Sequence, residues 1–160
     1  MFDKNSVLIS GVALYKDEKG VGRKWFVIKQ NDETSWELPK AITRKVESSV
    51  RAIIRTLQEQ GGMSIRVLEE AGRAGGATTV NGRTIPQRHI YYLATQTAKS
   101  EEGLGFNEFA WLDYAIAKKK LSKREQKMLT SANEELKKVI KKRQKKKKEK
   151  ERLEALEEKE

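Results

Sequence analysis

The most informative part of the sequence is residues 36–63, which read WELPKAITRKVESSVRAIIRTLQEQGGM. Its second half predicts an amphipathic helix over 47–60, because apolar residues recur there at the i, i+3, i+4, i+7 spacing of one helical face. This stripe consists of Val50, Ile53, Ile54 and Leu57. Gly61 and Gly62 follow the stripe and are typical of a helix C-terminus. The first half contains Pro39 and predicts a loop that leads into the helix.

Segments rich in β-branched and aromatic residues lie on both sides of this stretch and predict strands. They are residues 6–15, 24–30, 65–70, 88–96 and 109–112. Asn81-Gly82 lies between Thr78–Val80 and the strand 88–96, and this dipeptide is the strongest short signal for a β-hairpin. The order of the predicted elements indicates an α/β fold in which helices pack on a mixed sheet.

Two helices are predicted near the C-terminus. The first covers 113–120, and Ser122-Lys123-Arg124-Glu125 forms a capping box that starts the second. The apolar stripe of the second helix ends at Ile140. We therefore expect one domain over 1–140 and a Lys/Glu-rich tail over 141–160 that is either helical or disordered.

The stretch 36–63 resembles the Nudix box. The family pattern is G-x5-E-x7-R-E-U-x-E-E-x-G-U, with U an aliphatic residue, and W-x-[LF]-P-K commonly precedes it. The matching residues are Trp36, Leu38, Pro39, Lys40, Glu47, Arg55, Leu57, Glu59, Gly62 and Met63. The flanking elements, over about residues 6–140, look like the nucleotide-polyphosphate branch, which includes diadenosine tetraphosphate hydrolases. The resemblance implies a Nudix α/β/α sandwich with a mixed sheet, followed here by a charged C-terminal helical extension.

The sequence departs from the family pattern at the positions that carry the chemistry. At 100° per residue, positions 56, 59 and 60 share one arc of the helix. The resemblance implies three carboxylates there, which hold Mg²⁺ or Mn²⁺ and so activate a water for attack on phosphorus. This chain has Thr56, Glu59 and Gln60. Glu59 is therefore the main candidate metal ligand, a weak one, and Thr56 and Gln60 are degenerate catalytic positions.

The same region is more basic than the family pattern. Arg44 stands where the family often has an acid, and Ala41 and Val46 stand where it often has glycine. Cationic side chains can bind phosphate without a metal, and the candidates are Lys40, Arg44 and Arg55. The resemblance also implies a scaffold role for three residues of the box, Glu47, Arg55 and Gly62.

Further residues are candidates for catalysis or base stacking, and for each of them an ordinary structural role is the alternative. The resemblance implies that the loop before the last strand can supply a ligand or base, and Glu101, Glu102 and Glu108 lie there; the alternative is that they are solvated loop acids. We select Glu102 as the catalytic candidate. Tyr91 and Trp36 are candidates for stacking on a base, and the alternative is ordinary core packing.

Composition limits the chemistry further. The chain has 160 residues, no cysteine and one histidine, which excludes disulfides, thiol catalysis and any multi-histidine metal site. No apolar run approaches the roughly 18 residues of a membrane span, and the N-terminus lacks the layout of a signal peptide. We therefore expect a cytoplasmic protein without a membrane span.

The net charge of +11 points to polyanionic partners. Residues 137–148 contain nine Lys and Arg and no acid, and three interpretations remain open: a solvated helix face, contact with RNA or a ribonucleoprotein, and contact with a membrane surface. Residues 1–133 alone have a net charge of +7, so most of the excess lies in the body.

The sequence therefore predicts a Nudix-fold protein that binds a nucleoside-diphosphate-linked ligand or RNA phosphate, with hydrolysis weakened or lost. The ligand would be a nucleotide or a dinucleoside polyphosphate. The alternative is an active, Mg²⁺- or Mn²⁺-dependent Nudix hydrolase that cleaves the pyrophosphate bond of a nucleoside polyphosphate.

Overall fold

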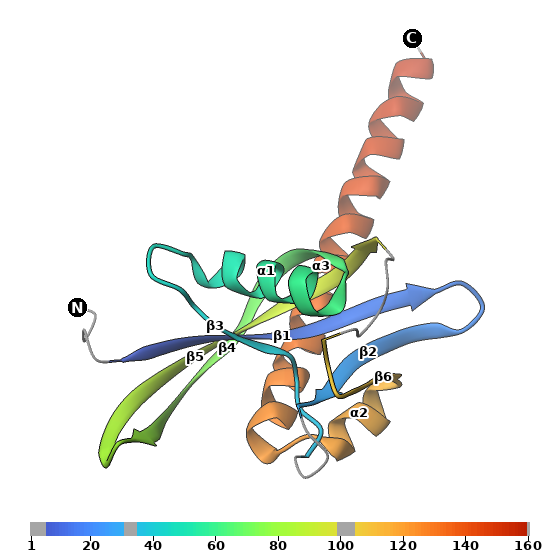
Figure 1. Cartoon of the computed structure of the whole chain (residues 1–160). Helices are drawn as coiled ribbons and strands as arrows, with labels where there is room; N and C mark the ends of the chain where they lie inside the picture. Colours follow the sequence, from blue (N-terminus) through green and yellow to red (C-terminus); the bar gives the residue numbers. More distant parts are fainter. Residues whose placement is uncertain (1–5, 31–34, 99–104, 160) are drawn as a thin grey trace.

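A computed structural model describes residues 6–30, 35–98 and 105–159 of the chain (Figure 1). Its strands are β1 (Val7–Glu18), β2 (Gly22–Lys29), β3 (Lys40–Ile42), β4 (Ser64–Val80), β5 (Arg83–Ala98) and β6 (Glu108–Leu112). Its helices are α1 (Ser49–Gly61), α2 (Tyr114–Lys120) and α3 (Lys123–Glu158).

The strands form one mixed sheet in the order β4-β5-β1-β2-β6, and β3 pairs with β1 outside this path. β1 runs parallel to β5 from the pair Val7–Gln87 to the pair Tyr15–Thr95. The remaining pairings of named strands are antiparallel. β1 contacts three strands because its first half pairs with β3 and its last residues pair with β2. It is therefore the centre of the sheet.

Alternate residues of the sheet feed two cores on opposite faces. On one face, Val12 and Leu14 of β1 pack with Ile53 and Leu57 of α1. On the other face, Ala13 and Tyr15 pack with residues of α2 and α3, which include Ala117, Leu129, Ala132 and Leu136. Helices thus cover both faces (Figure 1), which confirms the predicted α/β/α sandwich.

Helix α1 begins and ends close to the predicted limits. Ser48 is its N-cap, and the Ser48 side chain accepts a hydrogen bond from the backbone N–H of Arg51. Gly62 is the C-cap in the left-handed conformation, with φ of 58°, which glycine adopts without the steric cost of a Cβ atom. The loop before α1, however, contains the short strand β3, which the sequence pattern did not predict.

The predicted hairpin at Asn81-Gly82 is confirmed, and both residues have positive φ, as its turn type requires. Its strands are much longer than predicted. β4 continues without interruption through the glycine-rich run 72–76, which the sequence pattern left outside the strands. The run is strand because β5 supplies pairing partners for it, such as Tyr91 for Gly72 and Gln87 for Gly76.

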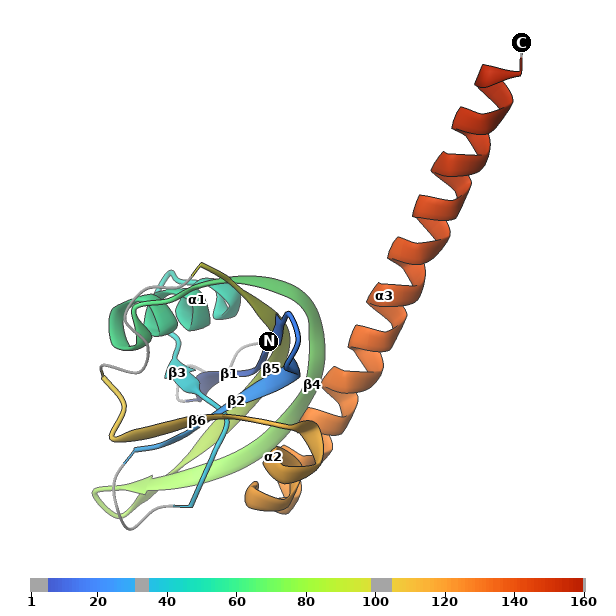
Figure 2. The ribbon, with the colours of Figure 1, turned by 90° about the vertical axis from the view of Figure 1, so that its right-hand side faces the viewer.

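Helix α3 has 36 residues and leaves the body part-way along its length (Figure 2). Its last buried residue is Leu136, Ile140 is partly buried against the core, and residues 141–159 are all exposed. The tail is thus helical, and the boundary near 140 stays a prediction. Among the described residues, no helix combines the length and apolar character needed to cross a membrane.

Candidate functional site

The loop 36–47 is joined to α1 by one ion pair. Both Nε and Nη2 of Arg55 donate to the carboxylate of Glu47, at 2.8 and 3.1 Å. Arg55 also donates to the carbonyl of Ile42 at 3.3 Å. Two of the three residues with an implied scaffold role, Glu47 and Arg55, are therefore in direct contact, and they hold the end of β3 against the helix.

This ion pair affects the acidity of Glu47. The hydrogen bonds from Arg55, followed by the one from the backbone N–H of Arg44, lower the pKa of Glu47 to about 2 from its ordinary value of 4.5. The carboxylate is therefore ionised at every pH at which the protein is expected to work.

The three positions of the metal-binding arc lie in different environments. Thr56 is buried, whereas Glu59 and Gln60 are exposed. The Glu59 carboxylate lies 3.5 Å from Nη1 of Arg55. No group of three His, Cys, Asp or Glu side chains that could hold a metal occurs in the described part of the chain. These donors do not fit the divalent metal centre that the family resemblance implies.

Of the three acids that could replace the missing metal ligands, only Glu108 lies among the described residues. Glu108 begins β6 and lies 3.7 Å from the ammonium of Lys29, and it does not line the groove described below. Glu101 and Glu102 lie outside the described residues. Their catalytic role stays a prediction.

A groove of about 460 Å³ lies between the β3 segment and α1. Its lining carries three cationic side chains and, among the described residues, no carboxylate. The lining residues are Lys40, Ala41, Ile42, Thr43, Arg44, Arg55, Thr56 and Gln60. Thr56 and Gln60 are thus brought together with all three candidate phosphate-binding residues.

The three cations of the groove are not equally available. Arg55 is held by Glu47, as described above. The ammonium of Lys40 lies 2.9 Å from Glu125 and 3.5 Å from Glu37. The guanidinium of Arg44, by contrast, makes no hydrogen bond or ion pair with a described residue. Arg44 is therefore the cation most available to a phosphate.

The sequence pattern did not reveal the role of Glu125. Its buried carboxylate accepts hydrogen bonds from the backbone N–H of Leu38 at 3.0 Å, from Lys40 at 2.9 Å and from the Tyr91 hydroxyl at 2.9 Å. The sequence pattern assigns Glu125 to the capping box at the start of α3 and so gives no sign of its contact with the loop. Ser122 does accept a weak bond from the backbone N–H of Glu125, at 3.4 Å, but the carboxylate is used to join α3 to the loop 36–40.

A second hollow, of about 720 Å³, adjoins the groove and shares Lys40 with it. It lies between the Trp36 segment, β5 and the first turn of α3. Trp36 is partly exposed there, and the ammonium groups of Lys29 and Lys120 lie 5.1 and 5.9 Å from its ring centroid. Trp36 thus lies beside the cationic groove with two ammonium groups over its ring, and stacking of this ring on a base stays a prediction.

Tyr91 and His89 also line the second hollow. Tyr91 is 1% exposed, so its ring offers no free face in this structure, and stacking on a base stays a prediction that requires the ring to become exposed. Burial and Glu125 raise the pKa of its hydroxyl. Burial, followed by Arg124 and Lys40, lowers the pKa of His89. Its buried Nδ1 has no hydrogen-bond partner among the described residues.

The basic run 137–148 lies on α3, outside the groove and the second hollow. Lys137 and Lys138 form i,i+3 ion pairs with Glu134 and Glu135. Contact of this run with RNA or a ribonucleoprotein stays a prediction.

No protein-family model matches the sequence, and no curated protein matches it either. Similar solved structures exist, however. A C. elegans Ap4A hydrolase in a binary complex superposes with a TM-score of 0.66 at 18% identity, over 81% of this chain and 97% of that chain. The NUDIX domain of Shewanella oneidensis NrtR, in complex with ADP ribose, gives 0.63 at 16% identity, over 84% and 90%.

An E. coli dihydroneopterin triphosphate pyrophosphohydrolase gives a TM-score of 0.63 at 11% identity, over 76% of this chain and 91% of that chain. These structures share the sandwich described above. The fold of the present chain is therefore the Nudix fold, as the box resemblance implied.

Proposed function

We propose that this protein binds a nucleoside-diphosphate-linked ligand, a nucleotide or dinucleoside polyphosphate, and that its metal-dependent hydrolysis is weakened or lost. The observation that carries the proposal is the lining of the groove between β3 and α1. It contains Thr56 and Gln60, at two of the three positions where the resemblance implies metal-binding carboxylates, beside the cationic side chains of Lys40, Arg44 and Arg55.

The charge of the groove supports direct binding of phosphate. Arg44 has an uncommitted guanidinium with five N–H donors in a planar fork, which suits phosphate oxygens. Lys40 and Arg55 are already paired with carboxylates, so they add positive potential and position rather than a free hydrogen-bonding group. A phosphate in this groove would contact Arg44 first.

The second hollow supports recognition of a nucleoside. It adjoins the groove through Lys40, and its lining includes the partly exposed Trp36 ring. Two of the structural neighbours, an Ap4A hydrolase and a domain complexed with ADP ribose, support this class of ligand.

Calorimetric titration of the full chain with diadenosine tetraphosphate and with ADP-ribose, without divalent metal, tests binding. Arg44→Gln is expected to lower the affinity about tenfold, because it removes a charge-assisted hydrogen bond. Arg51→Gln is the matched control, since Arg51 is an exposed arginine of α1 that does not line the groove. Equal affinity of the two variants would contradict the proposal.

Turnover assays with Mg²⁺ or Mn²⁺ test the second half of the proposal. We expect no turnover of diadenosine tetraphosphate, nucleoside triphosphates or capped RNA above the background without enzyme. Robust turnover that Glu59→Gln abolishes would instead establish the alternative, an active Nudix hydrolase in which Glu59 is the main metal ligand.

A further inference from the structure

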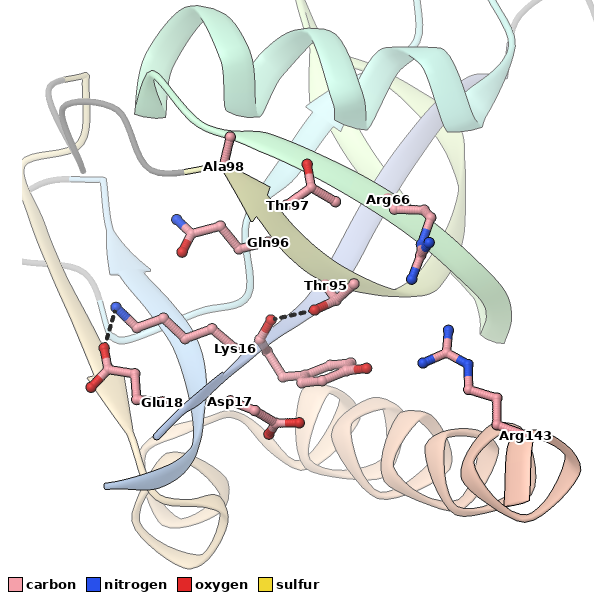
Figure 3. Close-up of a pocket in the computed structure, with 10 residues that line it drawn as sticks. Lys16, Asp17, Glu18, Arg66, Thr95, Gln96, Thr97, Ala98 and Arg143 are labelled. Atoms are coloured by element: carbon pink, nitrogen blue, oxygen red, sulfur yellow. Dashed lines mark hydrogen bonds and ion pairs between the residues drawn. The ribbon is translucent and has the colours of Figure 1, made fainter. Parts of the chain in front are cut away.

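A third hollow, of about 490 Å³, lies at the opposite end of β1 from the box loop (Figure 3). It is formed by the ends of β1 and β5, the start of β4, and α3 where that helix leaves the body. Its lining includes Arg66, Thr95, Thr97 and Arg143. Tyr15 of this hollow is four residues along β1 from Gly11, the pairing partner of Lys40, or about 13 Å away. The third hollow is thus separate from the nucleotide site.

Strand alternation and helix periodicity bring the two arginines together. Ile65 and Val67 pack against the core on the α1 side, so Arg66 between them points toward α3. Arg143 follows the buried Leu136 by seven residues and therefore lies on the same face of α3. Figure 3 shows the two guanidinium groups pointing toward each other across the hollow.

Neither guanidinium has a hydrogen bond or an ion pair with any residue that the structure describes. The two acids that line the hollow are already engaged. Asp17 accepts two hydrogen bonds from Arg23, at 2.8 and 3.2 Å, and Glu18 lies 2.9 Å from the ammonium of Lys16. Two like charges that face each other repel, and a bound anion would reduce the repulsion.

We infer that the Arg66–Arg143 hollow is a binding site for a phosphate group. One guanidinium fork is enough to satisfy the two oxygens of a planar carboxylate. Two forks on opposite walls instead suit a tetrahedral anion, whose oxygens point in several directions. Thr97 lines the same hollow, and the hydroxyl of Thr95 already donates to the carbonyl of Tyr15, at 3.3 Å.

The phosphate could belong to a small phosphorylated compound or to a phosphodiester strand. The second source has support from α3, because Arg143 lies within the run 141–148, which is basic except for Gln144 and fully exposed. A strand that lies on this part of the helix would place successive phosphates near Arg143. Both sources require the same two arginines, and the inference does not depend on the proposed nucleotide site.

The test uses the full chain and two probes: pyrophosphate, measured by calorimetry, and a labelled ten-nucleotide oligouridylate, measured by fluorescence anisotropy at low salt. Arg66→Gln and Arg143→Gln are each expected to weaken binding of at least one probe about tenfold. Arg152→Gln is the matched control, an exposed arginine further along α3. Arg44→Gln distinguishes binding in this hollow from binding in the groove beside α1, because Arg44 lines only the groove.

If Arg66→Gln and Arg143→Gln weaken the binding of pyrophosphate alone, the ligand is a small phosphate compound. If they weaken the binding of the oligonucleotide, the ligand is a phosphodiester strand. Both results support the inference. It is overturned if neither probe binds, if Arg66→Gln weakens binding no more than Arg152→Gln, or if only Arg44→Gln weakens it. Arg44→Gln without effect on diadenosine tetraphosphate would contradict the nucleotide site and leave this inference standing.

Discussion

The loop 36–47 is joined to the body by two carboxylates, and their surroundings differ. Glu125 at its start is buried, and three donors from the loop and from β5 converge on it. Glu47 at its end lies near the surface and is held by Arg55 and one backbone N–H. Loss of a buried acceptor leaves its donors without partners, whereas water replaces a surface acceptor. We therefore expect the contact of Glu125, which the sequence pattern does not reveal, to contribute more to stability than the contact of Glu47 within the box.

The largest expected effect is at the buried carboxylate. Glu125→Ala should lower the free energy of unfolding by about 3–5 kcal/mol, because it removes the nearer of two carboxylates from the ammonium of Lys40 and leaves the N–H of Leu38 and a buried tyrosine hydroxyl unpaired. Tyr91→Phe should cost only about 1 kcal/mol, since it removes a single hydrogen bond. Chemical denaturation measures both variants. Equal losses would show that Glu125 does not organise the cluster.

The groove between the two carboxylates provides the next prediction. Gln60→Glu adds a carboxylate beside Glu59 with almost no change in shape, and we expect Mn²⁺ to bind about tenfold more tightly as a result. Gln58→Glu is the control, because Gln58 is exposed on the same helix but does not line the groove. Calorimetry with Mn²⁺ compares the two variants, and equal affinities would show that charge at position 60 does not limit metal binding.

A smaller effect is expected at Val46, just before the surface carboxylate. Val46 has φ of 64° and is fully exposed, so a β-branched residue pays the steric cost of the left-handed conformation without gaining packing. Val46→Gly should raise the free energy of unfolding by about 1 kcal/mol. Lys45→Gly, at a position without positive φ, should not stabilise. Thermal unfolding of both variants distinguishes relief of strain from a general effect of glycine.

The smallest expected effect is that of the surface carboxylate itself. Because the pKa of Glu47 is lowered from 4.5 to about 2, its ion pair stabilises the fold above pH 4.5, and this contribution is lost as the pH falls toward 2. Glu47→Gln should therefore unfold more easily than wild type at pH 7, and the difference should disappear near pH 2. A difference that stayed constant between pH 5 and pH 2 would contradict this assignment.

The sequence was sufficient to predict the structural features that depend on the spacing of nearby residues. The stripe of α1, its glycine end, the hairpin turn at Asn81-Gly82 and the two terminal helices all follow from periodicity and turn chemistry. The glycine-rich part of β4 was not predictable in this way. Its strand conformation depends on pairing with β5, which is a property of the folded sheet rather than of the run itself.

The site was predictable only in part, for the same reason. The pattern marks positions 41 and 46 as places where the family often has glycine. Only Val46 has positive φ, because Ala41 lies in β3 and pairs with Ser10. The pattern also grouped Lys40 with the phosphate-binding candidates. Its ammonium instead lies against Glu125, a residue 85 positions away, and no local signal indicates a contact across that distance.

Helix α3 has a consequence for how the C-terminal part of the chain stays ordered. Starting a helix is unfavourable, whereas adding residues to an existing helix is not. Packing of Leu129, Ala132 and Leu136 against the sheet fixes the early turns, so the exposed residues after 140 only prolong a helix that the body has already started. At 1.5 Å per residue, Lys141–Glu158 forms a rigid spacer of roughly 27 Å. The exposed turns thereby hold Glu158 away from the sandwich, at a distance that depends on the number of residues in the helix rather than on contacts with the body.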